Sequence, residues 1–251
     1  MKGITMPWVW WIALPLSVWV VYTADHLLDA YRLGENANTA RHLFHHKNLR
    51  LILWVWSICA LSCSTWIFYF SPYALKMFGL GMAFLVLLHL LFVKLVGNRV
   101  SLALQKELGV AMIYATGVYG APLLIGVAGL SIIEWILFFQ FFLLCLGNLL
   151  MFALFEIEID KKDGHSSFVR AIGRTTANRL ILLILGVALV LSIFIFLQSA
   201  SFNELRVVIS QILMLSVHIY IMIRPIYFSK NERYRILGDT IFLLPIWTLL
   251  I

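Results

Sequence analysis

The sequence predicts an all-α polytopic membrane protein, with about eight transmembrane helices arranged as two four-helix halves of a single integral-membrane domain. Its 251 residues are 62% hydrophobic and only 12% charged, and the mean hydropathy is +0.94. Soluble domains are nearer ~45–50% apolar and ~25% charged, so the composition excludes an ordinary soluble domain. The apolar runs are long enough to cross a ~30 Å hydrocarbon core as helices and longer than the ~10-residue strands of a membrane barrel.

The first run starts at Pro7 and reaches Asp25 without a small-residue cleavage site, so we expect a retained span and not a removed signal peptide. The expected spans are residues 7–30, 49–71, 73–96, 104–128, 131–157, 175–198, 204–224 and 235–251. The halves then cover approximately residues 1–130 and 131–251. Three cysteines lie inside apolar runs without ligand or disulfide spacing, which indicates helix packing; they are Cys59, Cys63 and Cys145.

Basic residues predict the orientation of these spans. Sixteen lie on one side: Arg32, Arg41, Lys47, Arg50, Lys94, Arg99, Lys106, Lys161, Lys162, Arg170, Arg174, Arg179, Arg224, Lys230, Arg233 and Arg235. Only Lys2, Lys76 and Arg206 lie on the other. The positive-inside rule therefore places the sixteen in the cytoplasm and both termini outside, which we expect for a prokaryotic cytoplasmic membrane.

Most acidic residues share this predicted cytoplasmic side, ten of the twelve in the chain. The acidic bias is informative because Asp and Glu contribute little to membrane topology. We therefore expect the functional face to be cytoplasmic. The formal charge of +7 is explained by a basic membrane rim, and no motif indicates a nucleic-acid partner.

Two acidic pairs suggest an internal repeat. Asp25 and Asp29 close the first predicted span, and Glu156 and Asp160 close the fifth, each 131 positions after its counterpart. Each pair precedes a polar loop with His and Arg and then three further spans. This pattern predicts two halves in the same orientation, with a binding site between them.

The spacing of the pairs indicates a site for a hard cation. Residues at i and i+4 share a helix face, so each pair presents two carboxylates together. Near a membrane such charges are costly, up to about 2.5–3.5 kcal/mol each at the bilayer centre, which favours a compensating cation. Mg²⁺ binds one or two carboxylates together with waters and substrate phosphates. Alternatively, the acids solvate helix ends and pair with Arg32, Lys161 or Lys162.

In the cation interpretation, Asp25, Asp29, Glu156 and Asp160 are both the metal ligands and the catalytic residues. The phosphate shell of a bound diphosphate is then completed by Arg41, Lys106, Arg170 and Arg174. A hydrocarbon tail on that diphosphate extends between the spans, where aromatic faces can stabilise a carbocation. The candidate pocket residues are Tyr22, Tyr114, Tyr119, Asn148 and Phe152.

The chain resembles the UbiA superfamily of intramembrane prenyltransferases over roughly residues 15–200. The segment 155–167, FEIEIDKKDGHSS, is similar to the second aspartate-rich motif of that family, with Glu156 and Asp160 at the metal positions. Asp25 and Asp29 match the closing D-x-x-x-D of the first motif. Residues 39–42, TARH, resemble the T-x-R-P of the family, and Lys106 followed by residues 114–120 resembles its fourth helix.

The resemblance implies transfer of a prenyl group from an allylic prenyl diphosphate to a lipophilic, aromatic acceptor, with Mg²⁺ bridging the diphosphate to the four acids. The chain departs from the family at several positions. Val21 and Tyr22 replace the Asn-Asp of the first motif, and Leu149 and Phe152 replace an earlier Asp and Tyr of the second. The first motif also ends the first span here, where the family has it in the second.

Two other functions remain compatible with the sequence. A membrane terpene cyclase ionises the same diphosphate and closes the chain on itself, and the missing Asn-Asp favours it. A non-catalytic membrane protein that binds a metal or a lipid is the third possibility.

Overall fold

The computed structural model describes residues 6–36, 39–96, 102–125, 131–163, 167–199 and 202–244, and this part of the chain is helical without a strand. The long helices are α1 (Trp8–Leu33), α3 (Leu49–Phe70), α4 (Tyr73–Val96), α5 (Ala103–Ile125), α6 (Ile132–Lys162), α8 (Arg174–Gln198) and α9 (Phe202–Ile223). The short ones are α2 (Ala40–Lys47), α7 (Phe168–Ile172), α10 (Pro225–Ser229) and α11 (Arg233–Thr240), with 3-10 turns at Gly34–Asn36 and Lys230–Glu232.

Six helices in the described ranges are long and apolar enough to cross a membrane: α1, α3, α4, α6, α8 and α9. The fold is therefore all-α, and it fits a multi-pass membrane protein. The count of eight spans is not confirmed. The run predicted at 104–128 forms α5, which is not among the six, and the run predicted at 235–251 forms only α11 before the described residues end at 244.

The helices that carry the acidic pairs extend beyond the predicted ends. Helix α6 begins with a capping box in which the Ser131 hydroxyl accepts from the backbone N–H of Glu134 and the Glu134 carboxylate accepts from that of Ser131. It ends at Lys162, where Lys161 and Lys162 in the last turn complement the helix dipole. Helix α1 likewise continues to Leu33. Both acidic pairs thus lie within helices, in about the last two turns of each.

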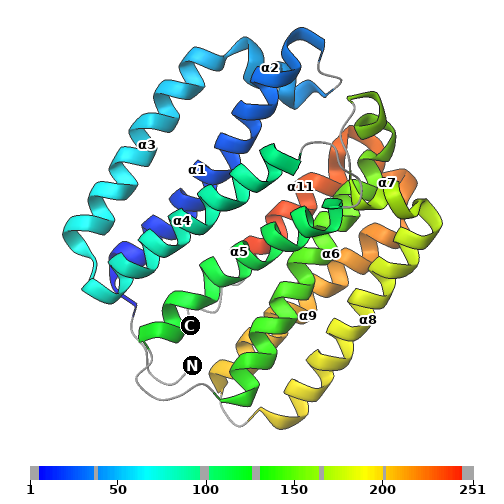
Figure 1. Ribbon diagram of the computed structural model, residues 1–251. Helices are drawn as coiled ribbons and strands as arrows, with labels where there is room; N and C mark the ends of the chain where they lie inside the picture. The colour runs from blue at the N-terminus through cyan, green and yellow to red at the C-terminus, as the bar shows by residue number, and fades with distance from the viewer. Residues whose placement is uncertain are drawn as a thin grey trace.

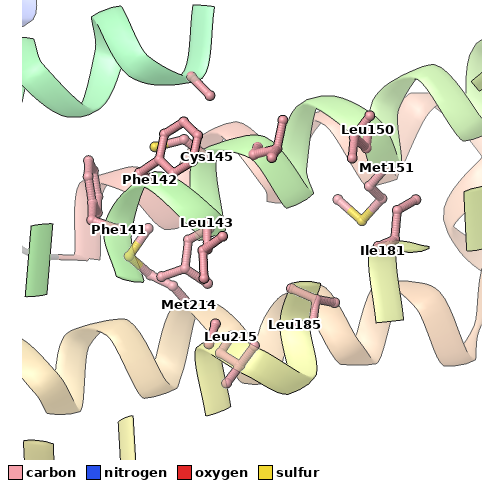
Figure 2. Packing of buried hydrophobic residues seen from close by; sticks show 14 of the residues in the cluster. Phe141, Phe142, Leu143, Cys145, Leu150, Met151, Ile181, Leu185, Met214 and Leu215 are labelled. Atoms are coloured by element: carbon pink, nitrogen blue, oxygen red, sulfur yellow. The ribbon is translucent and has the colours of Figure 1, made fainter. Parts of the chain in front are cut away.

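Helix α6 forms the centre of the second half. It packs against α5, α8 and α9. In its most apolar stretch, 72% of the residues are buried, whereas none are buried in the corresponding stretch of α4. Figure 2 shows Met151 of α6 beside Ile181 of α8 within this core. In contrast, α3 and α4 expose apolar side chains along most of their length, as expected for helices that contact lipid, which is as apolar as Leu.

The two halves meet along α5, which packs on α4 on one side and on α6 on the other (Figure 1). Because the long helices alternate in direction, α1 and α6 both finish at the same end of the bundle. Helices α2, α7 and α11 also lie at this end (Figure 1). We call it the polar end, and it holds both acidic pairs.

Candidate functional site

The acidic pair of α1 lies beside the short helix α2. Helix α2 begins at a cap in which the Thr39 hydroxyl accepts from the backbone N–H of His42 at 3.2 Å. This cap turns the His42 ring toward α1, where its Nε2 lies 3.9 Å from Oδ2 of Asp29. Asp25, one turn earlier on α1, is solvent-exposed. The first pair therefore opens to solvent while α2 covers its flank.

His26 lies between the two acids of α1 but is bonded to neither in the described structure. Its Nδ1 lies 2.9 Å from the carbonyl oxygen of Tyr22, and a carbonyl can only accept, so Nδ1 carries the proton. Its Nε2 is buried without a hydrogen-bond partner among the described residues. The Tyr22 ring lies against the His26 ring, with centroids 4.1 Å apart.

Arg41 of α2 reaches from the first half to the second. Its Nη2 lies 4.0 Å from Oε1 of Glu156 on α6. The two other nitrogens of the guanidinium, Nε and Nη1, are buried and have no acceptor in the described structure. A buried donor without a partner costs about 1–3 kcal/mol, more when the group is charged. Arg41 thus offers two unused, charged donors beside an acidic pair.

Glu156 is held by two residues of α11. The Tyr234 hydroxyl donates to Oε1 of Glu156 at 2.8 Å, and Arg235 donates to the same oxygen through Nε at 3.2 Å and through Nη2. The Tyr234 ring stacks on Phe155 at 4.4 Å, and the guanidinium of Arg235 lies 4.7 Å from the centre of the Phe152 ring. These contacts fasten α11 to α6.

Burial and the charge of Glu156 both shift the pKa of Tyr234 and of Arg235. Burial raises the pKa of Tyr234, and the Glu156 carboxylate raises it further, so the phenol stays protonated and remains a donor. Burial alone would lower the pKa of Arg235, but the Glu156 carboxylate more than offsets this and raises it. Arg235 is therefore a permanent cation on Glu156.

Asp160, one turn after Glu156, lies next to α7. Arg170 of α7 donates through Nη1 to the backbone oxygen of Asp160 at 3.1 Å. The backbone N–H of Phe168, at the start of α7, donates to Oε1 of Glu107 on α5 at 3.2 Å. Helix α7 is thus bonded to both α5 and α6, and Arg170 lies beside the second acidic pair.

Glu156, the first acid of the second pair, lies against two arginines, Arg41 and Arg235. Within the described ranges, no group of three or more His, Cys, Asp or Glu residues is arranged to hold a metal ion. The donor set nevertheless fits Mg²⁺, since each pair supplies hard carboxylate oxygens and Mg²⁺ needs only one or two of these with phosphate oxygens.

The two remaining candidates for phosphate binding, Lys106 and Arg174, lie in different surroundings. Lys106 lies in the first turn of α5 next to Glu107, where it is influenced by Arg32. Arg174 begins α8 and is exposed. Of the four predicted phosphate ligands, Arg41 and Arg170 contact residues of the second acidic pair.

The predicted pocket residues are distributed along α1, α5 and α6. Oδ1 of Asn148 lies 3.2 Å from Nε2 of the buried His218. The hydroxyl of the buried Tyr119 accepts from Gln211 at 2.8 Å. The ring of Tyr114 stacks on Phe141 at 6.1 Å. These three residues connect α5, α6 and α9 inside the second half.

Tyr22 and Phe152 lie nearer the acids, because Tyr22 contacts His26 and Phe152 lies under Arg235. A cavity of about 670 Å³ lies elsewhere, between α1 and α3. It is lined by Trp11, Ile12, Pro15, Leu16, Trp19, Cys59, Ser62 and Trp66. None of the five predicted pocket residues lines this cavity.

Sequence reasoning missed Tyr234 and Arg235 as members of the site. The last span was predicted to begin at residue 235, so Arg235 was counted only as a basic residue of the rim. A usable signal was present, because Arg235 and Asp239 repeat the i and i+4 spacing of the acidic pairs with one charge reversed.

Comparison of the chain with protein-family models, with curated proteins and with solved structures finds no match.

Proposed function

We propose that the protein is a Mg²⁺-dependent prenyltransferase that moves a prenyl group from an allylic diphosphate to a lipophilic, aromatic acceptor within the membrane. The observation that supports the proposal most strongly is the environment of the Arg41 guanidinium. Among the described residues, its Nε and Nη1 are buried without acceptors, beside the second of two acidic pairs whose spacing suits a hard cation. A group that satisfies both features is an anion that brings its own divalent cation, as a diphosphate does.

Each residue has a role in this proposal. The four carboxylates of Asp25, Asp29, Glu156 and Asp160 bind Mg²⁺, in two separate pairs. Bound Mg²⁺ supplies neutralisation of the charge that develops on the diphosphate as the C1–O bond breaks. Arg41 binds the same diphosphate oxygens through its two unused donors.

The carbon fragment that remains is an allylic cation. The exposed ring of Tyr22 is suited to stabilise it, because the face of an aromatic ring attracts a cation. The acceptor attacks C1 and loses a proton to complete the transfer. A chain that closes on itself in place of this attack gives the alternative activity, a membrane terpene cyclase, which the apolar Val21 in the first motif favours.

A non-catalytic function is favoured by a different observation. Glu156 already has Tyr234 and Arg235 as partners, so the second acidic pair is partly neutralised without a metal. In that case the protein would bind a lipid or a metal at the polar end without reacting with it.

One experiment separates the three functions. Purified protein is incubated with labelled prenyl diphosphates of several lengths, Mg²⁺ and a membrane lipid extract, and the lipid products are identified by mass spectrometry. A prenylated aromatic lipid supports transfer, and a cyclic hydrocarbon or alcohol formed without an acceptor supports the cyclase. Unchanged diphosphate at every chain length contradicts both enzyme proposals.

A further inference from the structure

Glu156 differs from the other acidic residues of the two pairs because a cation of the protein already occupies it. Its Oε1 accepts from the Tyr234 hydroxyl and from two nitrogens of Arg235. A second cation, Arg41, lies 4.0 Å from the same oxygen. These contacts all use Oε1, and the guanidinium charge repels a divalent ion that approaches either oxygen of the carboxylate. Arg235 therefore competes with a divalent cation for the Glu156 carboxylate.

A cation can replace Arg235 at Glu156 only if the Arg235 side chain moves, because α11 itself is tightly packed on α6. Gly238, one turn further on, packs so closely on α6 that a Cβ there would lie 2.6 Å from Cε1 of Phe152 and 2.7 Å from Oδ1 of Asn148. The stacked rings of Tyr234 and Phe155 hold the other end of the contact. The long side chain of Arg235, in contrast, can rotate about its own bonds.

The charges around Arg235 indicate which partner its guanidinium would bind after it leaves Glu156. Arg235 and Arg41 of α2 both lie against Oε1 of Glu156, so the Arg235 guanidinium lies where α2 of the first half meets α6 of the second. An anion bound across this junction offers it a new partner, and a planar guanidinium binds phosphate oxygens through paired hydrogen bonds.

We propose that Arg235 is an exchangeable counter-ion of Glu156. It neutralises the carboxylate while no divalent cation is bound, and it turns to the diphosphate once a cation takes its place. The inference rests on the proposed function and adds a step to it: cation binding and diphosphate binding are coupled through one side chain. Coupling of this kind typically changes an affinity by about 5- to 150-fold.

The test measures Mn²⁺ binding to the full-length purified protein by electron paramagnetic resonance of the free ion, with no diphosphate present. We expect Arg235→Gln to bind Mn²⁺ more tightly than wild type, by a factor within the about 5- to 150-fold range of such couplings. Arg235→Lys keeps the charge and should stay near wild type. The matched control is Arg233→Gln, because Arg233 lies on the same helix but stacks on Tyr227 at 4.4 Å.

A gain in affinity separates exchange from a merely structural role, because a damaged site would bind Mn²⁺ more weakly. If wild type binds Mn²⁺ and Arg235→Gln binds it equally or more weakly, the exchange is wrong while the proposed metal site stands. If neither protein binds Mn²⁺, the metal site fails and the exchange fails with it.

Discussion

Arg41 has two buried hydrogen-bond donors without an acceptor in the described structure. The third nitrogen of its guanidinium lies 4.0 Å from Glu156. A free energy cost of this kind persists only where something compensates for it, and a bound anion is the direct compensation. The same feature makes Arg41 a better candidate for diphosphate binding than the exposed Arg174.

Replacing Arg41 by Gln should therefore weaken diphosphate binding. We expect the dissociation constant of inorganic pyrophosphate, measured with Mg²⁺ by calorimetry, to rise by about tenfold or more, since a charged hydrogen bond contributes about 1.5–3 kcal/mol. Arg179→Gln, at an exposed position on α8, is the control and should bind as wild type does. Equal affinity of the Arg41 variant and wild type would show that Arg41 does not bind the anion.

The acids and Arg41 could be recognised from the sequence because spacing alone indicates them. Asp25, Asp29, Glu156 and Asp160 repeat at one offset, and Arg41 follows a Thr that can cap a helix. The spacing of Arg235 and Asp239 is a similar signal, but it does not indicate that Arg235 binds Glu156. The importance of Arg235 depends on the packing of α11 on α6, a contact between positions 79 residues apart in sequence.

At the scale of the helices, α11 is the element that completes the site, and Gly238 determines how closely it packs. The short distance to Phe152 leaves no room for a side chain. The helix contains Tyr234 and Arg235 on the side that meets Glu156. Any change that moves α11 away from α6 should therefore free Glu156.

Gly238→Ala should destabilise the protein, because overpacking a tight contact typically costs about 1–3 kcal/mol. Gly186→Ala is the matched control, since nothing lies within 4 Å of its added Cβ, and replacing a helical Gly with Ala stabilises by about 0.5–1 kcal/mol. Thermal unfolding in detergent measures both. A Gly238→Ala protein as stable as wild type would show that α11 is not packed as described.

The long helices were predictable because apolar length is a strong signal. The expected span 73–96 coincides with α4, and 49–71 differs from α3 by one residue. Helices α2 and α7 were not predicted, because they are short and polar and depend on hydroxyl caps at Thr39 and Ser167. Such caps stabilise a helix by only about 1 kcal/mol, too little to stand out in a polar loop.

At the scale of the whole molecule, the alternation of the long helices gathers most of the charged residues at one end. Figure 1 shows α2, α7 and α11 at that end, beside the last turns of α1 and α6. The predicted orientation, with this end in the cytoplasm, follows from the distribution of Lys and Arg. The number of membrane crossings and the orientation can be measured together.

Cysteines introduced at the polar end should react with an impermeant maleimide only after the cells are permeabilised. The positions are His45 on α2 and Lys230 beside α11. Tyr73, 76% exposed at the opposite end of α4, should be labelled in intact cells when replaced by Cys. Strong labelling of position 45 or 230 from outside would reverse the orientation or change the number of spans.

In the proposed function, the acidic pairs of α1 and α6 act together on a Mg²⁺-bound prenyl diphosphate. The most direct test is release of inorganic pyrophosphate from allylic prenyl diphosphates by wild type and by Asp29→Asn and Asp160→Asn. An amide keeps the size of the side chain but loses the anion that holds a hard cation. The controls are Glu35→Gln, outside the pairs, and Glu134→Gln, where Gln preserves the capping box.

We predict that wild type and both control variants release pyrophosphate in the presence of Mg²⁺. Asp29→Asn and Asp160→Asn should release none, although both should be extracted from the membrane as folded protein. A wild-type protein that releases no pyrophosphate at any prenyl length, or a paired-site variant that keeps full activity, would disprove the proposed function.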